Sequence, residues 1–314
     1  PAELGADEGF HVEPSVIVVF DTFTKLAMSK FSHPQKHPDC LRSRQPHVKD
    51  CRAIGASPRT RREAIGRTGV SFHEGIRDGR EIDATAWVGR EETREGRLSE
   101  ELAGMMGAAL GHAAAPGSDL SPGAAMPPLW HWAAFPEFVP MEELGADGHP
   151  RLGRFLPPLP YPRRMWAGGQ LSFDGTLAVG ETLRRRSEIV SVDEKQGGTG
   201  SMVFVRVAHA VEGARGRIEE RQDIVYLDIP ETFRPPKAIP APGEPDFEET
   251  VAMSEARLFR FSAATFNAHR IHYDLAYTRE VEKYPNLVVH GPMQAMLLME
   301  AATRHVGQAP AKFR

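Results

Sequence analysis

Apolar side chains recur at helical spacing in two segments of the chain. Between residues 98 and 110 they fall three or four positions apart, Ser99 is placed as an N-cap, and Gly111 lies just past the end. Residues 291–305 are apolar nearly all round, and Pro292 can open a helix at its first turn. The pattern predicts two helices, of which the second must be buried on several sides.

Partial alternation of apolar and polar positions, with many β-branched residues, marks four longer segments. Because successive side chains of a strand point to opposite faces, these segments predict an antiparallel meander of long strands. They span residues 168–179, 182–192, 201–211 and 218–229. Shorter strands are predicted at residues 16–20 and 256–263.

Changes of composition divide the chain into four parts. Residues 1–80 turn basic and bury little apolar surface, so we expect an irregular or disordered extension there. Residues 82–232 form a first domain, and the proline-rich residues 233–244 form a stiff linker. Residues 245–314 form a second domain. Its helix is followed only by the start of a strand at 312–314, so we expect a domain that is incomplete and unstable unless a partner supplies further strands.

Length, charge and cysteine content exclude several classes of protein. The 314 residues suit about two domains, and the net charge of −4 gives no electrostatic footprint for nucleic acid. No apolar run is long enough for a membrane span. Two cysteines, Cys40 and Cys51, and no visible signal peptide favour the cytoplasm. The histidines near these cysteines do not match zinc-site spacing, so no metal is predicted.

The densest polar cluster lies between Asn267 and Gly291. His272 has an ordinary pKa near neutrality, so it can take and return a proton. Asn267, five residues earlier, can hold a water molecule in the same pocket. Gly291 begins the apolar helix, where its backbone N–H and the helix dipole can stabilise negative charge on a carbonyl oxygen. These are the parts needed to add water to an enoyl thioester.

The order of these residues resembles a known signature. Thr265-Phe266-Asn267, His272 and His290-Gly291-Pro292 are similar to the motif of MaoC-like, R-specific enoyl-CoA hydratases. The blocks FNAHRIHYD and YPNLVVHGP, together with Trp87–Arg90 and Pro127–Trp132, look more like one branch of that family. The branch contains mesaconyl-CoA and itaconyl-CoA hydratases and the mitochondrial 3-hydroxyacyl-thioester dehydratase.

The resemblance implies a fold, a reaction and a set of partners. The fold is α+β, a double hot-dog in which a long helix is wrapped by a curved antiparallel sheet, with the second hot-dog truncated. The activity is that of a hydro-lyase, which hydrates a 2-enoyl-CoA such as mesaconyl-CoA or itaconyl-CoA, or dehydrates a 3-hydroxyacyl thioester. It implies no cofactor, an acyl-CoA or acyl carrier protein thioester as partner, and a homodimer or a pseudo-dimer within one chain.

One residue departs from the broader family. Asn267 occupies the place of a titrating Asp, and an amide can orient water but cannot accept its proton. We therefore expect His272 to be the only base, delivering the proton and the water oxygen to one face of the substrate.

Four further residues are predicted to bind substrate, each beside a plainer alternative. Arg270 can pair with a coenzyme A phosphate or face solvent. His290 can contact substrate or simply hold its neighbours in position. Trp130 and Trp132 can line an acyl tunnel or belong to an aromatic core.

Two other functions remain open at this stage. A hot-dog thioesterase usually needs a carboxylate on the central helix, and the helix at 291–305 offers only Glu300, late along its length. An inactive acyl-thioester-binding fragment is the other alternative.

Overall fold

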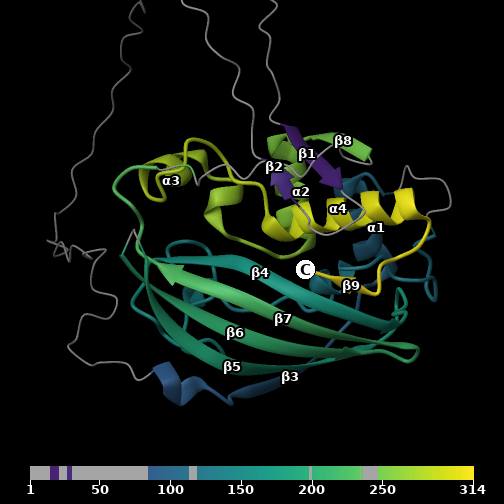
Figure 1. Ribbon diagram of the computed structural model, residues 1–314, viewed down its shortest axis with the longest axis horizontal. Helices are drawn as coiled ribbons and strands as arrows, with labels where there is room; N and C mark the ends of the chain where they lie inside the picture. Colours follow the sequence, from purple (N-terminus) through teal and green to yellow (C-terminus); the bar gives the residue numbers. More distant parts are fainter. Residues whose placement is uncertain are drawn as a thin grey trace, which may run out of the picture. The chain divides into compact units, whose positions relative to one another are not determined.

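The computed structural model of the chain describes residues 15–20, 27–29, 84–112, 119–197, 200–233, 235 and 247–314. Its main elements (Figure 1) are, in chain order, β1 (Ser15–Phe20), β2 (Ala27–Ser29), β3 (Glu91–Gly96), α1 (Glu100–Leu110), β4 (Arg163–Gly175), β5 (Leu183–Gly197), β6 (Gly200–Glu212), β7 (Gly216–Leu227), β8 (Phe247–Ala252), α2 (Glu255–Ala264), α3 (Leu275–Glu280), α4 (Gly291–Val306) and β9 (Lys312–Phe313). Short 3-10 turns lie at Ala84–Trp87, Trp130–Ala133, Met141–Glu143 and Arg270–His272.

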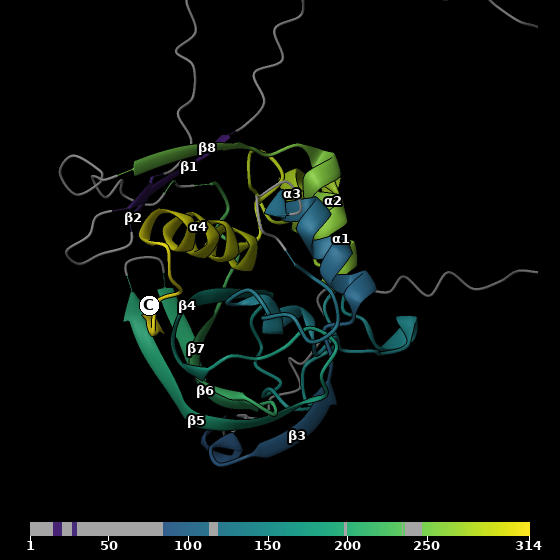
Figure 2. The ribbon, with the colours of Figure 1, turned by 90° about the vertical axis from the view of Figure 1, so that its right-hand side faces the viewer.

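Six strands form one antiparallel sheet in the order β3-β5-β6-β7-β4-β9, and Figure 2 shows its curvature. The four long strands predicted from alternation are confirmed. The expected meander order is wrong, because β4 pairs along its length with β7 and not with β5. Alternation specifies which face of a strand is buried, and it carries no information on which strand lies alongside.

Both predicted helices are confirmed, the first with both of its predicted caps and the second with Pro292 in its first turn. Ser99 accepts a hydrogen bond from the backbone N–H of Leu102 at 3.2 Å, and Gly111 ends α1 in the left-handed region with φ 87°. Helix α4 has Pro292 in its first turn and ends at Gly307 with φ 76°. No helix in the described part of the chain is long and apolar enough to cross a membrane.

The strand predicted at 256–263 is wrong, because these residues form helix α2. Ser254 caps the helix by accepting a hydrogen bond from Arg257 N at 3.3 Å. Leu258 and Phe261, three residues apart, are buried, whereas Phe259 is 63% exposed. The burial therefore follows the helical period and not the alternation of a strand. The strand that precedes this helix is β8.

The strand predicted at residues 16–20 is present as β1. It pairs antiparallel with β8 and with β2 in a separate three-stranded sheet, and both ribbon views place β1 beside α4. The remainder of residues 1–80, including Cys40 and Cys51, lies outside the described residues. So does nearly all of the predicted linker at 233–244.

One hydrophobic core joins helices α1, α2 and α4 to the concave part of the main sheet. The apolar side chains of α4 that were expected to lack cover are buried in it, among them Met293, Met296, Leu297 and Met299. Strand β9 forms where the start of a strand was predicted, and Phe313 pairs with Leu171 at the edge of β4. The second half of the chain thus extends the sheet of the first, as a double hot-dog requires.

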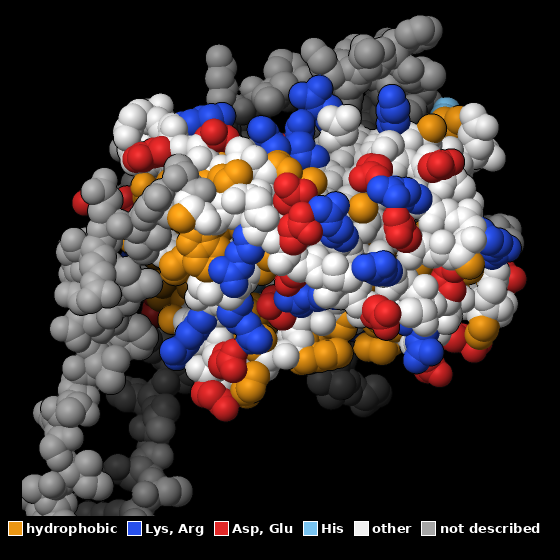
Figure 3. All heavy atoms as spheres, turned by 90° about the horizontal axis from the view of Figure 1, so that it is seen from below, with side chains coloured by type: hydrophobic (Ala, Val, Ile, Leu, Met, Phe, Trp, Pro, Cys, Tyr) orange, Lys and Arg blue, Asp and Glu red, His pale blue; other side chains and the backbone are white. Residues whose placement is uncertain are grey.

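Charged side chains of both signs are interspersed over the face seen in Figure 3. Ion pairs join neighbouring strands of the main sheet, such as Arg206 with Asp223 between β6 and β7 and Arg186 with Glu91 between β5 and β3. Such pairs fix strand register and keep the outer face of the sheet soluble.

Candidate active site

A tight loop after α2 carries the predicted catalytic residues. Phe266 ends the helix with φ 52°, and Asn267 N donates to the carbonyl of Ser262 at 2.8 Å. The side-chain Oδ1 of Asn267 accepts from His269 N at 3.0 Å and so starts the next turn. This cap leaves the Asn267 amide Nδ2 as a donor for water or substrate.

His272 is held in the tautomer that a general base needs. Its Nδ1 lies 2.7 Å from the carbonyl oxygen of Val288, which can only accept, so Nδ1 carries the proton and Nε2 keeps its lone pair. The ring is 6% exposed, and this burial lowers the pKa of His272 to about 4. The imidazole is therefore neutral near pH 7.

His290 packs against the ring of His272. The two imidazoles stack with centroids 3.6 Å apart, and His290 Nε2 lies 2.8 Å from Ser262 Oγ. Burial, followed by the neighbouring histidines, lowers the pKa of His290 to about 2. A neutral, fixed ring of this kind can hold the His272 ring in place.

The amino end of α4 meets this pair of rings, because His290 is the N-cap residue of the helix. Gly291 follows, and a Cβ at that position would lie 2.9 Å from Cε3 of Trp166. Only glycine therefore lets the Trp166 indole pack against the start of the helix. Backbone N–H groups of a first helical turn lack intrahelical acceptors, so this end can bind a developing negative charge.

A buried network of charged and polar groups lies between the loop that carries His269 and strand β4. Glu282 Oε2 accepts a hydrogen bond from Arg163 Nε at 2.8 Å, and Oε1 lies 3.5 Å from Nε2 of His269. Burial raises the pKa of Glu282, but His269 and Arg163 outweigh it and hold that pKa below its usual value. Since Arg163 belongs to β4, this network ties the catalytic loop to the main sheet.

A loop from the first half of the chain docks on the catalytic loop. Arg270 N donates to the carbonyl of Asp147 at 2.9 Å, and a Cβ on Gly148 would lie 1.9 Å from the carbonyl oxygen of Ala268. The docking brings the ring of His149 to 4.2 Å from that of His269. The sequence interpretation missed this loop, because its partners are more than a hundred residues away.

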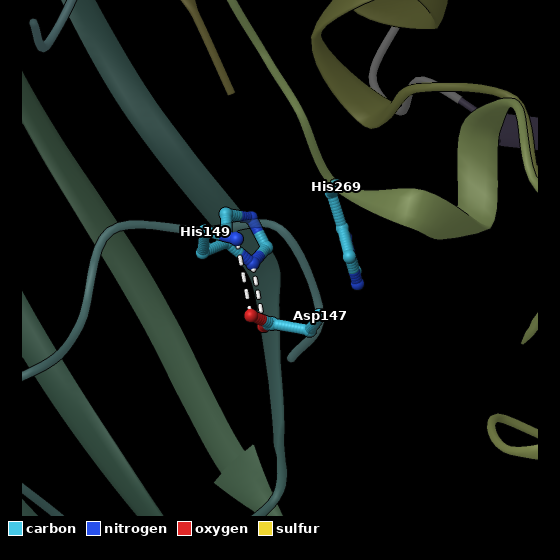
Figure 4. Close-up of side chains that lie close together, drawn as sticks. All are labelled: Asp147, His149 and His269. Carbon is cyan, nitrogen blue, oxygen red and sulfur yellow. Dashed lines mark hydrogen bonds and ion pairs between the residues drawn. The ribbon is translucent and has the colours of Figure 1, made fainter. Parts of the chain in front are cut away.

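Asp147, His149 and His269 form the group of described residues with metal-ligand spacing, with donor atoms within 4.8 Å of one another (Figure 4). Within the group, Asp147 Oδ2 already accepts a hydrogen bond from His149 Nδ1 at 2.8 Å. Burial opposes the charge of Asp147, yet His149 lowers the pKa of that carboxyl to about 2. Burial and the charge of Arg164 lower the pKa of His149 to about 3. The pair is thus a satisfied carboxylate–histidine dyad.

A cavity of about 410 Å³ lies beside the amino end of α4 and is lined by Pro292, Trp166, His149 and the inner face of the main sheet. Trp132 lines it as well, and its Nε1 donates to Glu220 at 2.9 Å. Trp130 lies elsewhere, fully buried in the core, where it donates to Glu300 at 2.9 Å.

Arg270 faces its own loop. Its guanidinium pairs with Asp274 at 2.7 Å, donates to the carbonyl of Ala146 and lies 4.1 Å from the ring centre of Tyr277. The structure therefore brings His272 against His290 at the amino end of α4, where Gly291 follows, and it places Asn267 in the same loop as His272. Among the residues predicted to form the site, Trp132 lines the cavity, and the helix that begins at Gly291 meets it through Pro292.

Comparison with known proteins gives the family. The model of the family described as hydroxyacyl-thioester dehydratase type 2 matches residues 129–314. A mesaconyl-C(4)-CoA hydratase of Chloroflexus aurantiacus is 43% identical over 229 residues, which cover 72% of this chain and 80% of that protein. The chain belongs to the hydroxyacyl-thioester dehydratase type 2 family. The resemblance found in the sequence is confirmed, and so is the class of hydratases and dehydratases.

Other members and neighbours of the hydroxyacyl-thioester dehydratase type 2 family are more distant. The mitochondrial hydroxyacyl-thioester dehydratase type 2 of Schizosaccharomyces pombe is 27% identical over 200 residues, covering 55% of this chain and 65% of that protein. Among solved structures, a MaoC-like dehydratase is similar with a TM-score of 0.48 and 13% identity, covering 70% of this chain and 78% of that one. A Mycobacterium tuberculosis protein described as a double hot-dog has a TM-score of 0.39 and 16% identity over 70% of this chain and 74% of its own.

Proposed function

We propose that the chain adds water to the double bond of a 2-enoyl thioester, or removes it from the 3-hydroxyacyl thioester, with His272 as the general acid and base. The observation that carries the proposal is the hydrogen bond from His272 Nδ1 to the Val288 carbonyl. It directs the free lone pair of Nε2 away from the backbone. A neutral imidazole in this tautomer is ready to take a proton from water.

Each step uses a residue of this site. His272 Nε2 removes a proton from water while the water oxygen bonds to C3 of the substrate. The electrons of the double bond move onto the thioester carbonyl, and the Gly291 N–H at the start of α4 stabilises the resulting oxyanion. The His272 imidazolium then returns the proton to C2, so both additions occur on one face. Asn267 orients the water through its Nδ2.

The chemistry of the relatives supports the substrate class. The Chloroflexus aurantiacus relative is named for mesaconyl-C(4)-CoA, a short, branched, dicarboxylic enoyl thioester. We extend that class to this chain, with coenzyme A or acyl carrier protein as the carrier. The residues of the mechanism exchange only protons and water, so the reaction needs no cofactor. We also propose a cytoplasmic location and a pseudo-dimeric or homodimeric assembly.

Hydrolysis of the thioester is the competing reaction, and the position of Glu300 argues against it. The Glu300 carboxylate is buried, bonded to Trp130 Nε1 and 3.3 Å from His112 Nδ1, nine residues beyond the start of α4. It is therefore neither free nor close to the oxyanion end of the helix.

The test is a His272→Asn variant, whose side-chain NH2 can still donate to the Val288 carbonyl. Loss of the base should lower kcat about 10²–10⁴-fold without loss of folding. Hydration is followed by the absorbance of the enoyl bond, and hydrolysis by release of free thiol. Turnover by His272→Asn close to that of the parent would refute the role of His272, and thiol release without hydration would favour a thioesterase.

A further inference from the structure

Five arginines line the cavity, and two of them, the exposed Arg151 and the half-buried Arg164, have no carboxylate partner among the described residues. Arg94 pairs with Glu92 and Glu137, Arg185 lies 3.5 Å from Glu92, Arg154 pairs with Glu143, and Arg151 donates to the carbonyl of Leu144. Arg164 makes no ion pair with any residue that the structure describes.

Each acidic residue of the cavity wall already has a hydrogen-bond or ion-pair partner other than Arg164. Glu92 and Glu137 belong to the pairs just named, and Glu220 accepts from Trp132, from Gln222 at 2.7 Å and from His131 at 3.2 Å. None of them is left over to neutralise Arg164, so the cavity carries an excess of positive charge at that point.

The groups around Arg164 are neutral. It lies opposite Tyr226 in the β4–β7 pairing, and directly opposed residues of antiparallel strands share a face. Tyr226 is fully buried; burial raises the pKa of Tyr226 to about 12 against the opposing effect of Arg164, so the hydroxyl stays protonated. The depressed pKa of His149 keeps that neighbour neutral as well.

Arg164 lies on the same wall as the oxyanion end of the site. Trp166, two residues along β4, packs on Gly291, and both Arg164 and Trp166 line the cavity. On the other side, the charge of Arg164 acts on His149. The ring centre of His149 lies 4.2 Å from that of His269, and the ring centre of His269 lies 5.5 Å from that of His272. The far end of an acyl chain whose thioester is bound at the amino end of α4 would therefore meet the wall that carries Arg164.

We propose that Arg164 binds the free carboxylate of a dicarboxylic enoyl thioester and makes the chain selective for acyl groups with an anionic end. The inference rests on the proposed function, because it takes His272 and Gly291, next to the Pro292 that lines the cavity, as the reacting end. A guanidinium binds a carboxylate through charge-assisted hydrogen bonds, and a neutral acyl group would leave it unpaired.

The experiment compares two acyl groups of equal length on two carriers. Fumaryl and crotonyl thioesters differ in the terminal carboxylate, and each is made with coenzyme A and with N-acetylcysteamine, which has no phosphate. For Arg164→Gln we expect kcat/KM to fall about 10–100-fold for both fumaryl thioesters and less than 3-fold for both crotonyl thioesters. Arg164→Lys should recover part of the loss. Arg186→Gln, which removes an exposed arginine paired with Glu91, is the matched control and should change none of the four values.

Three results would overturn the proposal. A loss confined to the coenzyme A thioesters would assign Arg164 to a carrier phosphate, and an equal loss on all four would show a structural role. Binding of the saturated succinyl and butyryl thioesters, measured by calorimetry, separates this inference from the proposed function. If the parent chain hydrates no thioester, the proposed function fails. Even then, tighter binding of the succinyl than of the butyryl thioester, abolished in Arg164→Gln, would support carboxylate binding. Equal binding of both by the parent overturns it.

Discussion

His272 donates a hydrogen bond from Nδ1 to the backbone carbonyl of Val288 at 2.7 Å, and Val288 N in turn donates to the carbonyl of Ile271 at 2.9 Å. The segment before α4 and the turn that carries the proposed base are thus held together by backbone groups. No side chain other than the imidazole is needed to fix the tautomer. The geometry of the base therefore depends on the backbone path between residues 270 and 290, and side-chain substitutions there should affect it less than insertions.

The pH profile of activity should report the depressed pKa of His272. Burial lowers that pKa to about 4 from an ordinary value of 6.5, and the base works in its neutral form. We expect kcat/KM for hydration to be flat from about pH 8 to about pH 5 and to fall below that. Circular dichroism at each pH separates loss of the base from unfolding. A midpoint near 6.5 in folded protein would show that the ring is charged at ordinary pH and contradict the assignment.

Stability should also depend on pH through His272. Its folded pKa lies below its unfolded pKa, so the unfolded chain takes up a proton first as the pH falls. The contribution to stability is fully present above about pH 6.5 and is lost as the pH falls toward 4. We expect the free energy of unfolding from urea titrations to drop between pH 7 and pH 5, and to drop less in His272→Asn. An identical slope in the two proteins would contradict the linkage.

Gly291→Ala should impair catalysis through contact with Trp166. The added Cβ would lie 2.9 Å from the indole, so the ring or the start of α4 must shift. Because oxyanion donors act over short distances, we expect kcat to fall about 10–100-fold with a smaller change in Tm. Replacing Trp166 by Leu in the same protein makes room for the methyl group and should restore part of kcat. If the relative kcat of the double variant is no higher than the product of the relative kcat values of the two single variants, contact with Trp166 is not the cause of the loss.

Much of the site could be predicted because its residues are close in sequence. Asn267 and His272 lie in one turn, and His290 and Gly291 lie where a proline-opened helix must begin. Local patterns also predicted both caps of α1 and the start of α4 at Pro292. Helix α2 was misread because Leu258, Phe259 and Phe261 satisfy a short strand almost as well as a helix. Only the burial of Leu258 and Phe261 and the exposure of Phe259 distinguish the two.

The rest of the site depends on contacts between distant parts of the chain. Trp166, Arg163 and Arg164 lie on a strand that alternation predicts only in part, and nothing local reveals that they face α4 and the catalytic loop. His149 and Asp147 occupy an ordinary polar turn, and they acquire a role only when that turn packs on residues 268–270. Such residues could be identified only from the pairing of β4 with β7, and the sequence pattern gave the wrong neighbour for β4.

Gly148→Ala should separate the docked turn from the catalytic loop. The new Cβ would lie 1.9 Å from the Ala268 carbonyl oxygen, and the residue has φ 89°. A left-handed backbone alone costs a non-glycine residue about 1–2 kcal/mol. Gly123→Ala is the matched control, because Gly123 has φ 88° and nothing within 4 Å of its Cβ position. Gly148→Ala should therefore lower the free energy of unfolding more than Gly123→Ala, and it alone should reduce kcat, since His149 and His269 lose their contact. Equal stability and full activity in both variants would show that the turn does not support the base.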